Sequence, residues 1–167
     1  DPVSPRPAGP GEREKQGEEM SPVPIADDLF TWSDDEPGLI GGRCAECGAH
    51  VFPLRAGCPR CGATAVERTL LNRSGTLWSW TTQGFPPKAP FRGEFAGTDP
   101  FEPWLVGVVE LAGQLRVEGL ITGCSQDELA IGMPMRVVTM PFRTDEDGRE
   151  IITFAFGPGE GDETGHA

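Results

Sequence analysis

Four of the five cysteines fall into two closely spaced pairs. Cys44 and Cys47 lie in the segment RCAECG, Cys58 and Cys61 lie in CPRCG, and ten residues separate the pairs. Each C-x-x-C turn can present two thiolates to one point, and four sulfur ligands suit a tetrahedral zinc ion. The glycine after each pair permits the left-handed backbone that such turns often require. The sequence therefore predicts one structural zinc ion bound by these four cysteines.

Three other arrangements use the same residue types. Disulfides are disfavoured because the polar, Pro-rich N-terminus carries no secretory signal. A redox C-x-x-C normally occurs once, beside a βαβ pattern that this sequence lacks. A mononuclear iron site of rubredoxin type uses the same ligands and stays open. In either metal site all four positions are cysteine, so no position is left for catalysis.

Few other residues have types that could do chemistry. His50 is expected on the surface of a hairpin between the cysteine pairs, and Cys124 is expected to be a buried, inert thiol. Glu110 and Glu118 stand alone on predicted strands and should be solvated. The sequence shows no Ser/His/Asp set and no histidine beside a thiol. We therefore expect that the chain is not an enzyme on its own.

A long aromatic loop is the second unusual feature. Residues 83–103 hold five prolines, three glycines and four phenylalanines. A loop of this length in a small domain is more often functional than neutral. We expect it to contact a partner or ligand, and the alternative is a lid folded onto its own domain. The aromatic residues of this predicted partner or lid loop are Phe85, Phe91, Phe95, Phe101 and Trp104.

The elements that position these residues are mainly β. The chain has 23 glycines and 17 prolines, so long helices cannot dominate. Alternating or apolar runs predict five strands, which form the pattern of an OB-fold barrel, with an SH3-like barrel as the competitor. In the first strand, Trp78 and Trp80 are expected to share one face. The predicted strands are 66–82, 105–111, 115–121, 133–140 and 150–156.

Four regions are expected along the chain. Residues 1–23 should be a disordered linker, because residues 1–19 are rich in Pro, Gly and Glu and hold no periodic apolar residues. Residues 24–65 should form a short helix over 24–33 followed by the zinc ribbon. Residues 66–158 should form the barrel, and residues 159–167 an acidic tail. The missing initial Met suggests a piece of a longer chain, and Met20 as the true start is the alternative.

The charge pattern limits the function classes. The net charge is −12, of which residues 1–42 carry −7 and residues 143–167 carry −5, so that the middle is balanced. Nucleic-acid binders usually show a basic stripe, so the charge pattern does not favour nucleic acid as a partner. No run of 18 apolar residues exists, so no transmembrane helix is predicted. We expect a cytoplasmic protein.

Four motifs in this order resemble the acyl-CoA-associated zinc-ribbon/OB-fold family, long catalogued as a domain of unknown function. They are RCAECG at 43–48, CPRCG at 58–62, GTLWSWTT at 75–82 and IGMPMRV at 131–137. The resemblance covers roughly residues 24–158. It implies a non-catalytic accessory domain that binds a thiolase-superfamily aldolase, which cleaves a β-hydroxyacyl-CoA by a retro-aldol reaction.

The resemblance also implies finer features. Some members are joined to a MaoC-like hydratase domain in the same longer chain, and such a pair acts in actinobacterial steroid side-chain breakdown. Arg60, Lys88 and Arg92 would be the groups to test for contact with the phosphates of an acyl-CoA. The alternative function is a zinc-ribbon/OB-fold module that binds single-stranded nucleic acid.

Overall fold

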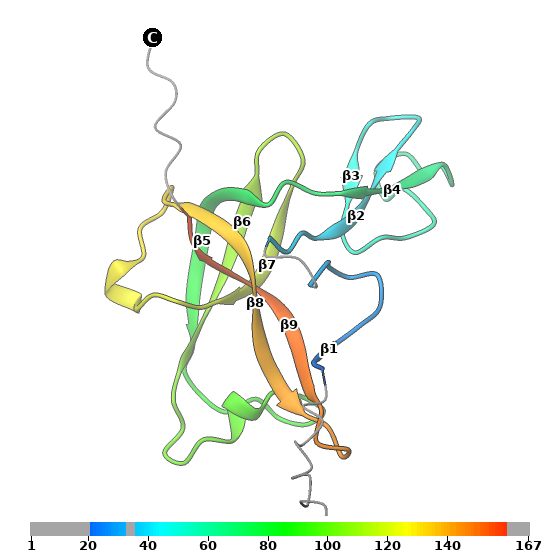
Figure 1. Cartoon of the computed structure of the whole chain (residues 1–167). Coiled ribbons are helices and arrows are strands. Elements are labelled where there is room, and N and C mark those ends of the chain that lie inside the picture. Colours follow the sequence, from blue (N-terminus) through cyan, green and yellow to red (C-terminus); the bar gives the residue numbers. More distant parts are fainter. Residues whose placement is uncertain (1–20, 33–35, 160–167) are drawn as a thin grey trace, which may run out of the picture.

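Short strands dominate the computed structural model, which describes residues 21–32 and 36–159 (Figure 1). Two 3₁₀ turns, η1 (Glu94–Gly97) and η2 (Gln126–Glu128), interrupt them. The strands are β1 (Val23–Pro24), β2 (Ile40–Cys44), β3 (His50–Val51), β4 (Val66–Leu70), β5 (Ser74–Gln83), β6 (Trp104–Leu111), β7 (Leu115–Ile121), β8 (Pro134–Thr144) and β9 (Glu150–Pro158).

Strands β5 to β9 form a closed OB-fold barrel. The sheet runs β1-β9-β7-β6-β5-β8, and an additional β8–β9 pairing closes the ring. Alternate residues of each strand point inward, as the side-chain period of two requires. The barrel interior is filled by Leu77, Val109, Leu111, Val117, Ile121, Met135, Val137, Ile152 and Phe156. The expected mainly β architecture and its last four barrel strands are confirmed, each within a few residues.

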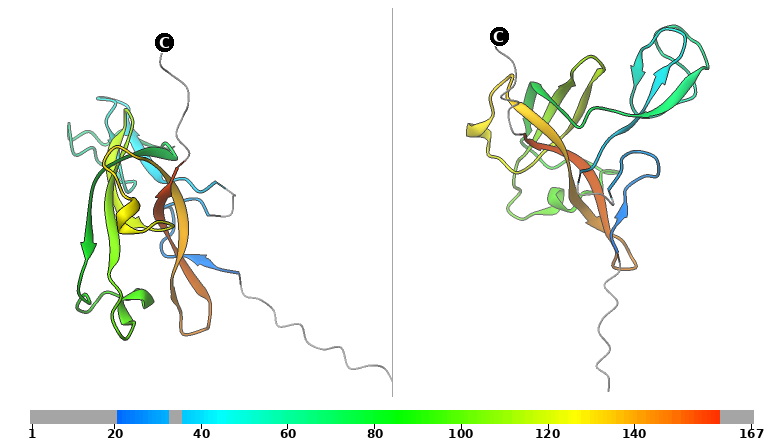
Figure 2. Two further views of the ribbon diagram at one scale, coloured as in Figure 1. Left: turned by 90° about the vertical axis from the view of Figure 1, so that its left-hand side faces the viewer. Right: turned by 45° about the horizontal axis from the view of Figure 1, so that its top comes forward.

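A second, three-stranded sheet with the order β3-β2-β4 carries the cysteine pairs. In Figures 1 and 2 it projects from one end of the barrel. The expected single strand over 66–82 is therefore divided, because β4 pairs with β2 whereas β5 pairs with β6 and β8. Residues 71–73 join the two sheets, and the buried side chains of Leu39 and Leu71 belong to the barrel core.

The short helix expected over 24–33 is wrong for residues 24–32. Val23 and Pro24 pair in parallel with Ile151 and Ile152, and Phe30 bridges to Leu39. Asp28 has a φ of 52°, outside the helical region. The apolar residues of this segment reach the core from an extended chain rather than from one helix face. Trp32 packs against the core from this segment. Residue 33 and most of the expected linker and tail (1–20 and 160–167) lie outside the described residues.

The expectation that Trp78 and Trp80 share a face is also wrong. The register between β5 and β6 shifts between Leu77 and Ser79, so that Leu77 pairs with Val109 and Trp80 pairs with Gly107. Such a β-bulge inserts one residue and reverses the alternation beyond it. Trp78 is therefore 50% exposed, whereas Trp80 packs against the core.

The long loop between β5 and β6 lies at the end of the barrel away from the three-stranded sheet (Figures 1 and 2). The turn between β8 and β9 lies at this same end. No helix in the described part of the chain is long and apolar enough to cross a membrane.

Candidate metal centre and aromatic loop surface

Two turns of the same construction hold the four cysteines. The amide N–H of Gly48 donates to the carbonyl of Cys44, and that of Gly62 donates to the carbonyl of Cys58, each at 2.9 Å. The two glycines have φ values of 70° and 77°, a conformation that carries little strain only without a Cβ. The hairpin expected between the cysteine pairs is wrong: in residues 48–57 only β3 is a strand, and it pairs with β2 across the first turn.

The four sulfur atoms lie at the spacing that zinc requires. The Sγ atoms of Cys44 and Cys61 are 3.7 Å apart, those of Cys47 and Cys58 are 3.6 Å apart, and all four lie within 4.8 Å of one another. A tetrahedron with zinc–sulfur bonds of about 2.3 Å has edges of about 3.8 Å. The residues present therefore fit one four-coordinate ion, and they would hold it as a structural centre.

The electrostatics of the cluster also favour a cation. Hydrogen bonding from the backbone of Cys61 lowers the pKa of the Cys58 thiol to about 6. At Cys61 the backbone of Ala63 favours the thiolate, but the adjacent sulfur of Cys47 and its neighbours raise the pKa to about 12. Adjacent thiolates repel one another unless a cation lies between them, and a bound metal ion removes that conflict.

An aromatic cluster folds the long loop onto the barrel. The ring of Phe95 lies 4.8 Å from that of Trp104 at the start of β6, and Phe91 stacks on Trp104 at 5.8 Å with an interplanar angle of 16°. Phe101 contacts the same tryptophan at 5.4 Å. Four of the five predicted loop aromatics therefore meet, whereas Phe85 is 70% exposed and takes no part in these ring contacts.

Sequence reasoning missed one member of this aromatic cluster. Phe142 of β8 lies 5.7 Å from both Phe91 and Phe95. The carboxylate of Glu94 adds a polar anchor, since its Oε1 accepts the backbone N–H of Thr144 at 2.6 Å. The loop thus rests on its own barrel, and Phe91 remains 41% exposed on the outside of the cluster. Phe142 was missed because the predicted strand 133–140 ends before it, whereas β8 continues to Thr144.

The three basic residues singled out for CoA phosphates do not lie together. Arg60 belongs to the second cysteine turn, between β3 and β4, whereas Lys88 and Arg92 belong to the long loop. Figure 1 shows these two regions at opposite ends of the barrel. The three side chains therefore do not form one phosphate-binding site.

The remaining chemical groups form no further metal site in the described ranges, where the four cysteines are the cluster found. Cys124 is half-buried against the core, and burial, followed by the nearby charge of Glu128, raises the pKa of its thiol. A raised pKa leaves less thiolate at neutral pH, so this cysteine is a poor nucleophile.

Comparison with known proteins finds relatives for both modules. The description "ChsH2, rubredoxin-like zinc ribbon domain" matches residues 31–67, and "ChsH2, C-terminal OB-fold domain" matches residues 69–140. These matches identify the cysteine site as the zinc site of a ribbon and the barrel as an OB fold.

Three relatives cover most of the described chain. A DUF35 domain-containing scaffold protein of Methanocaldococcus jannaschii is 31% identical over 120 residues, which are 71% of this chain and 78% of the relative. Subunit BbsA of the benzoylsuccinyl-CoA thiolase of Thauera aromatica is 28% identical over 128 residues, with coverage of 72% and 76%. A chain of the solved Ltp2-ChsH2(DUF35) aldolase superposes with a TM-score of 0.53 at 25% identity, with coverage of 72% and 84%.

Proposed function

This chain belongs to the DUF35 family, and from that premise we propose that it is a non-catalytic scaffold subunit of a thiolase-superfamily enzyme. The observation that carries the proposal is the likeness to the Ltp2-ChsH2(DUF35) aldolase, which covers 72% of this chain. BbsA, a subunit of a thiolase, supports the same role. Another relative is itself called a scaffold protein.

The chemistry of the described residues agrees with a supporting role. The four cysteines fill the coordination sphere of zinc, so the ion stabilises the ribbon and leaves no position for a substrate. The loop aromatics, by contrast, present apolar surface beside the barrel, since Phe85 and Phe91 are 70% and 41% exposed. Exposed aromatic residues of this kind are typical of protein interfaces.

We further propose that the partner is an aldolase acting on a β-hydroxyacyl-CoA, in which the partner's own residues break the carbon–carbon bond. This chain would dock beside the substrate entrance and exclude water from it. Lys88 and Arg92, on the long loop, would face the CoA phosphates there. A steroid side chain as the acyl group, and coupling to a MaoC-like hydratase domain, complete the proposal. These finer parts come from the family resemblance.

The test is capture followed by reconstitution. The tagged full chain is used to recover proteins from a lysate of its source organism, and mass spectrometry identifies them. The recovered thiolase-superfamily enzyme is then purified alone, mixed with the chain and analysed by size-exclusion chromatography with light scattering. We expect a complex of fixed stoichiometry. Failure of every purified thiolase-superfamily enzyme of the organism to bind would overturn the proposal, and binding of single-stranded DNA instead would favour the nucleic-acid function.

Loop variants test which surface carries the complex. Phe85→Asp and Phe91→Asp place a charge on exposed aromatic positions, and we expect each to weaken binding of the enzyme at least about 10-fold, because a desolvated carboxylate opposes docking. Ile131→Asp is the matched control, since Ile131 is also exposed, at 63%, but lies in the segment between β7 and β8. Equal binding by all three variants would remove the loop from the interface.

A further inference from the structure

The outward surface of β5, β6 and β7 has two half-buried valines at its centre, Val106 and Val108, with polar side chains around them. Its central strand β6 reads WLVGVVEL, a nearly continuous apolar run. Such a run is typical of strands that are covered on both faces, whereas a strand with one solvated face alternates. We call this surface the outer face. Its outward residues are Ser79 and Thr81 of β5, Val106, Val108 and Glu110 of β6, and Arg116, Glu118 and Leu120 of β7, with Trp78 at the bulge.

The outer face is continuous with the aromatic cluster of the loop. Trp104, Val106 and Val108 alternate along β6 and therefore point to the same side. Trp104 is also the residue on which Phe91, Phe95 and Phe101 converge. An apolar path thus leads from the long loop onto the middle of the sheet.

The two carboxylates of the outer face differ in their partners. Glu110 accepts from Arg116, whose Nε lies 2.7 Å from Oε2, and the Arg116 guanidinium also lies 4.1 Å above the ring of Trp78. Glu118 is exposed, and among residues 21–32 and 36–159 it forms no ion pair and no side-chain hydrogen bond. Its cross-strand neighbour is Val108, which offers no cation.

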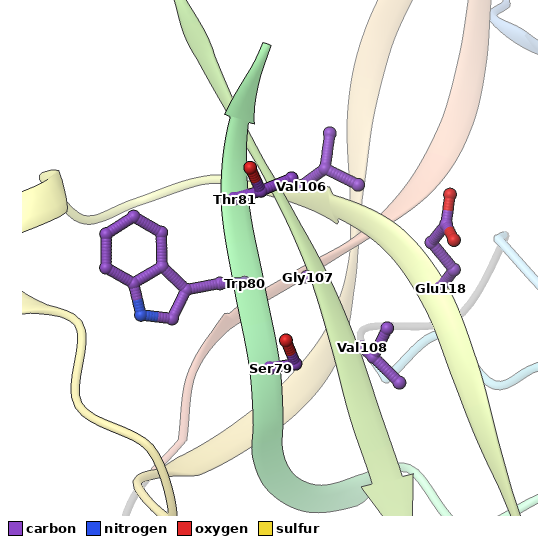
Figure 3. Close-up of a pocket in the computed structure, with 7 residues that line it drawn as sticks. All are labelled: Ser79, Trp80, Thr81, Val106, Gly107, Val108 and Glu118. Atoms are coloured by element: carbon purple, nitrogen blue, oxygen red, sulfur yellow. The ribbon is translucent and has the colours of Figure 1, made fainter.

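A shallow hollow of about 150 Å³ lies beside Glu118 (Figure 3). Figure 3 shows the Glu118 carboxylate next to Val108, with the hydroxyls of Ser79 and Thr81 across the hollow, while the ring of Trp80 points the other way. Small-molecule sites usually have volumes of about 300 Å³ or more. The hollow therefore suits one incoming side chain better than an acyl-CoA, and the Glu118 carboxylate on its edge suits the N–H donors of arginine or lysine.

We infer that the outer face docks on the thiolase-superfamily enzyme and that Glu118 accepts an arginine or lysine side chain of that enzyme. This inference rests on the proposed function. It further identifies which surface of this chain contacts the enzyme and which charged residue lies in that contact. Val106, Val108 and the aromatic cluster supply the apolar area, and Glu118 fixes the register. A carboxylate in the middle of an apolar contact is stable only when a cation meets it, so the charge selects the occupant.

The same charge disfavours two other occupants. A second copy of this chain bound about a two-fold axis would place the outer face against itself, and Arg116, the cation of that face, is already paired with Glu110. A nucleic-acid strand would bring phosphates toward Glu118, and like charges repel. Both occupants remain outcomes that the experiment distinguishes.

The experiment measures binding of the purified thiolase-superfamily enzyme to the full chain by isothermal titration calorimetry. We expect Glu118→Arg to weaken binding at least about 30-fold and Glu118→Gln to weaken it less. Val108→Lys keeps Glu118 but places a cation opposite it, so this variant should also weaken binding. Glu67→Arg on β4 is the control, with the same change of charge on a different sheet. Zinc content and melting temperature of each variant confirm the fold.

Each result decides the matter. Loss of binding in the Glu118 and Val108 variants, with normal binding by Glu67→Arg, supports the inference. The inference is overturned if the wild type binds and Glu118→Arg binds equally well. It is also overturned if Glu67→Arg weakens binding as much as Glu118→Arg does. In both cases the proposed function stands. Absence of any wild-type complex overturns both. Self-association or DNA binding that responds to Glu118→Arg identifies the other occupants and overturns the inference.

Discussion

At the residue scale, each ligand pair owes its position to the backbone of its own turn. Gly48 and Gly62 close the two turns on the carbonyls of Cys44 and Cys58 with identical hydrogen bonds. Each pair of sulfur atoms therefore converges because of local geometry, and the pairing of β2 with β4, in which Cys44 lies opposite Val66, brings the first turn to the second. Zinc then replaces the hydrophobic core that so small a module cannot build.

Loss of one ligand should abolish this centre. We expect Cys58→Ser to reduce zinc affinity by more than about 100-fold, since even changes to groups behind the ligands cost 10–100-fold. Cys124→Ser makes the same chemical change at a half-buried thiol outside the site and should retain one zinc ion per chain. Metal content after dialysis against a competing chelator measures both. One tightly bound zinc ion in Cys58→Ser would contradict the assignment of the ligands.

The zinc ligands were predictable because their spacing is local. The surroundings of other residues were not predictable, because they depend on neighbours that are distant in sequence. Cys44, Cys47, Cys58 and Cys61 are read from two short motifs. Glu118, in contrast, was expected to be merely solvated, and its distinction from Glu110 depends on a neighbour across the sheet. Alternation along one strand cannot reveal which carboxylate finds a cation.

At the element scale, the long loop behaves as an ordered part of the barrel. Its apolar side chains converge on Trp104 and Phe142, and Glu94 fastens it to the end of β8. Ordering 20 or so residues costs conformational entropy, which the ring contacts must offset. The loop therefore presents Phe85 and the outer side of Phe91 from a fixed base.

Removal of the Phe142 ring should loosen the loop. Phe142→Ala deletes contacts to Phe91 and Phe95, and we expect a loss of about 1–3 kcal/mol in stability for this half-buried ring. Limited proteolysis should then cut within residues 84–103 faster than in the wild type. Phe85→Ala is the matched control, because that ring is 70% exposed. Equal cleavage of the two variants would mean that Phe142 does not anchor the loop.

The element errors have specific physical causes. Apolar residues at 25, 29, 30 and 32 matched helical spacing, but Val23 and Pro24 add to the edge of β9 through a contact that is remote in sequence. The bulge in β5 reversed the faces of the two tryptophans, and one extra residue leaves no mark on composition. The other strands were predictable because their alternation is regular and glycines or polar turns bound them.

At the scale of the whole molecule, the ribbon and the barrel share buried side chains. Leu39 precedes the ribbon, Leu71 follows it, and both are buried in the barrel core. The ribbon is therefore held at a fixed place on the barrel, although its own interior depends on zinc. The spacing of the apolar runs predicted five barrel strands but left an SH3-like barrel as the competitor, and the pairing order in the structure establishes the closed OB-type ring.

Zinc removal should destabilise the ribbon more than the barrel. After chelation we expect the amides of β2 and β4 to lose protection from hydrogen exchange, while those of β6 and β7 keep most of theirs, because the barrel has its own core. Mass spectrometry of exchanged peptides measures this difference. Simultaneous loss of protection in all four strands would show a single cooperative unit.

The closure of the barrel has a consequence in time. The ribbon pairs residues between 40 and 70, whereas the ring closes only when Ser74 meets Arg136 and β8 meets β9. Contacts distant in sequence form slowly, and a chain emerging from the ribosome presents its N-terminal parts first. Metal loading can thus be complete while β8 and β9 are still being synthesised.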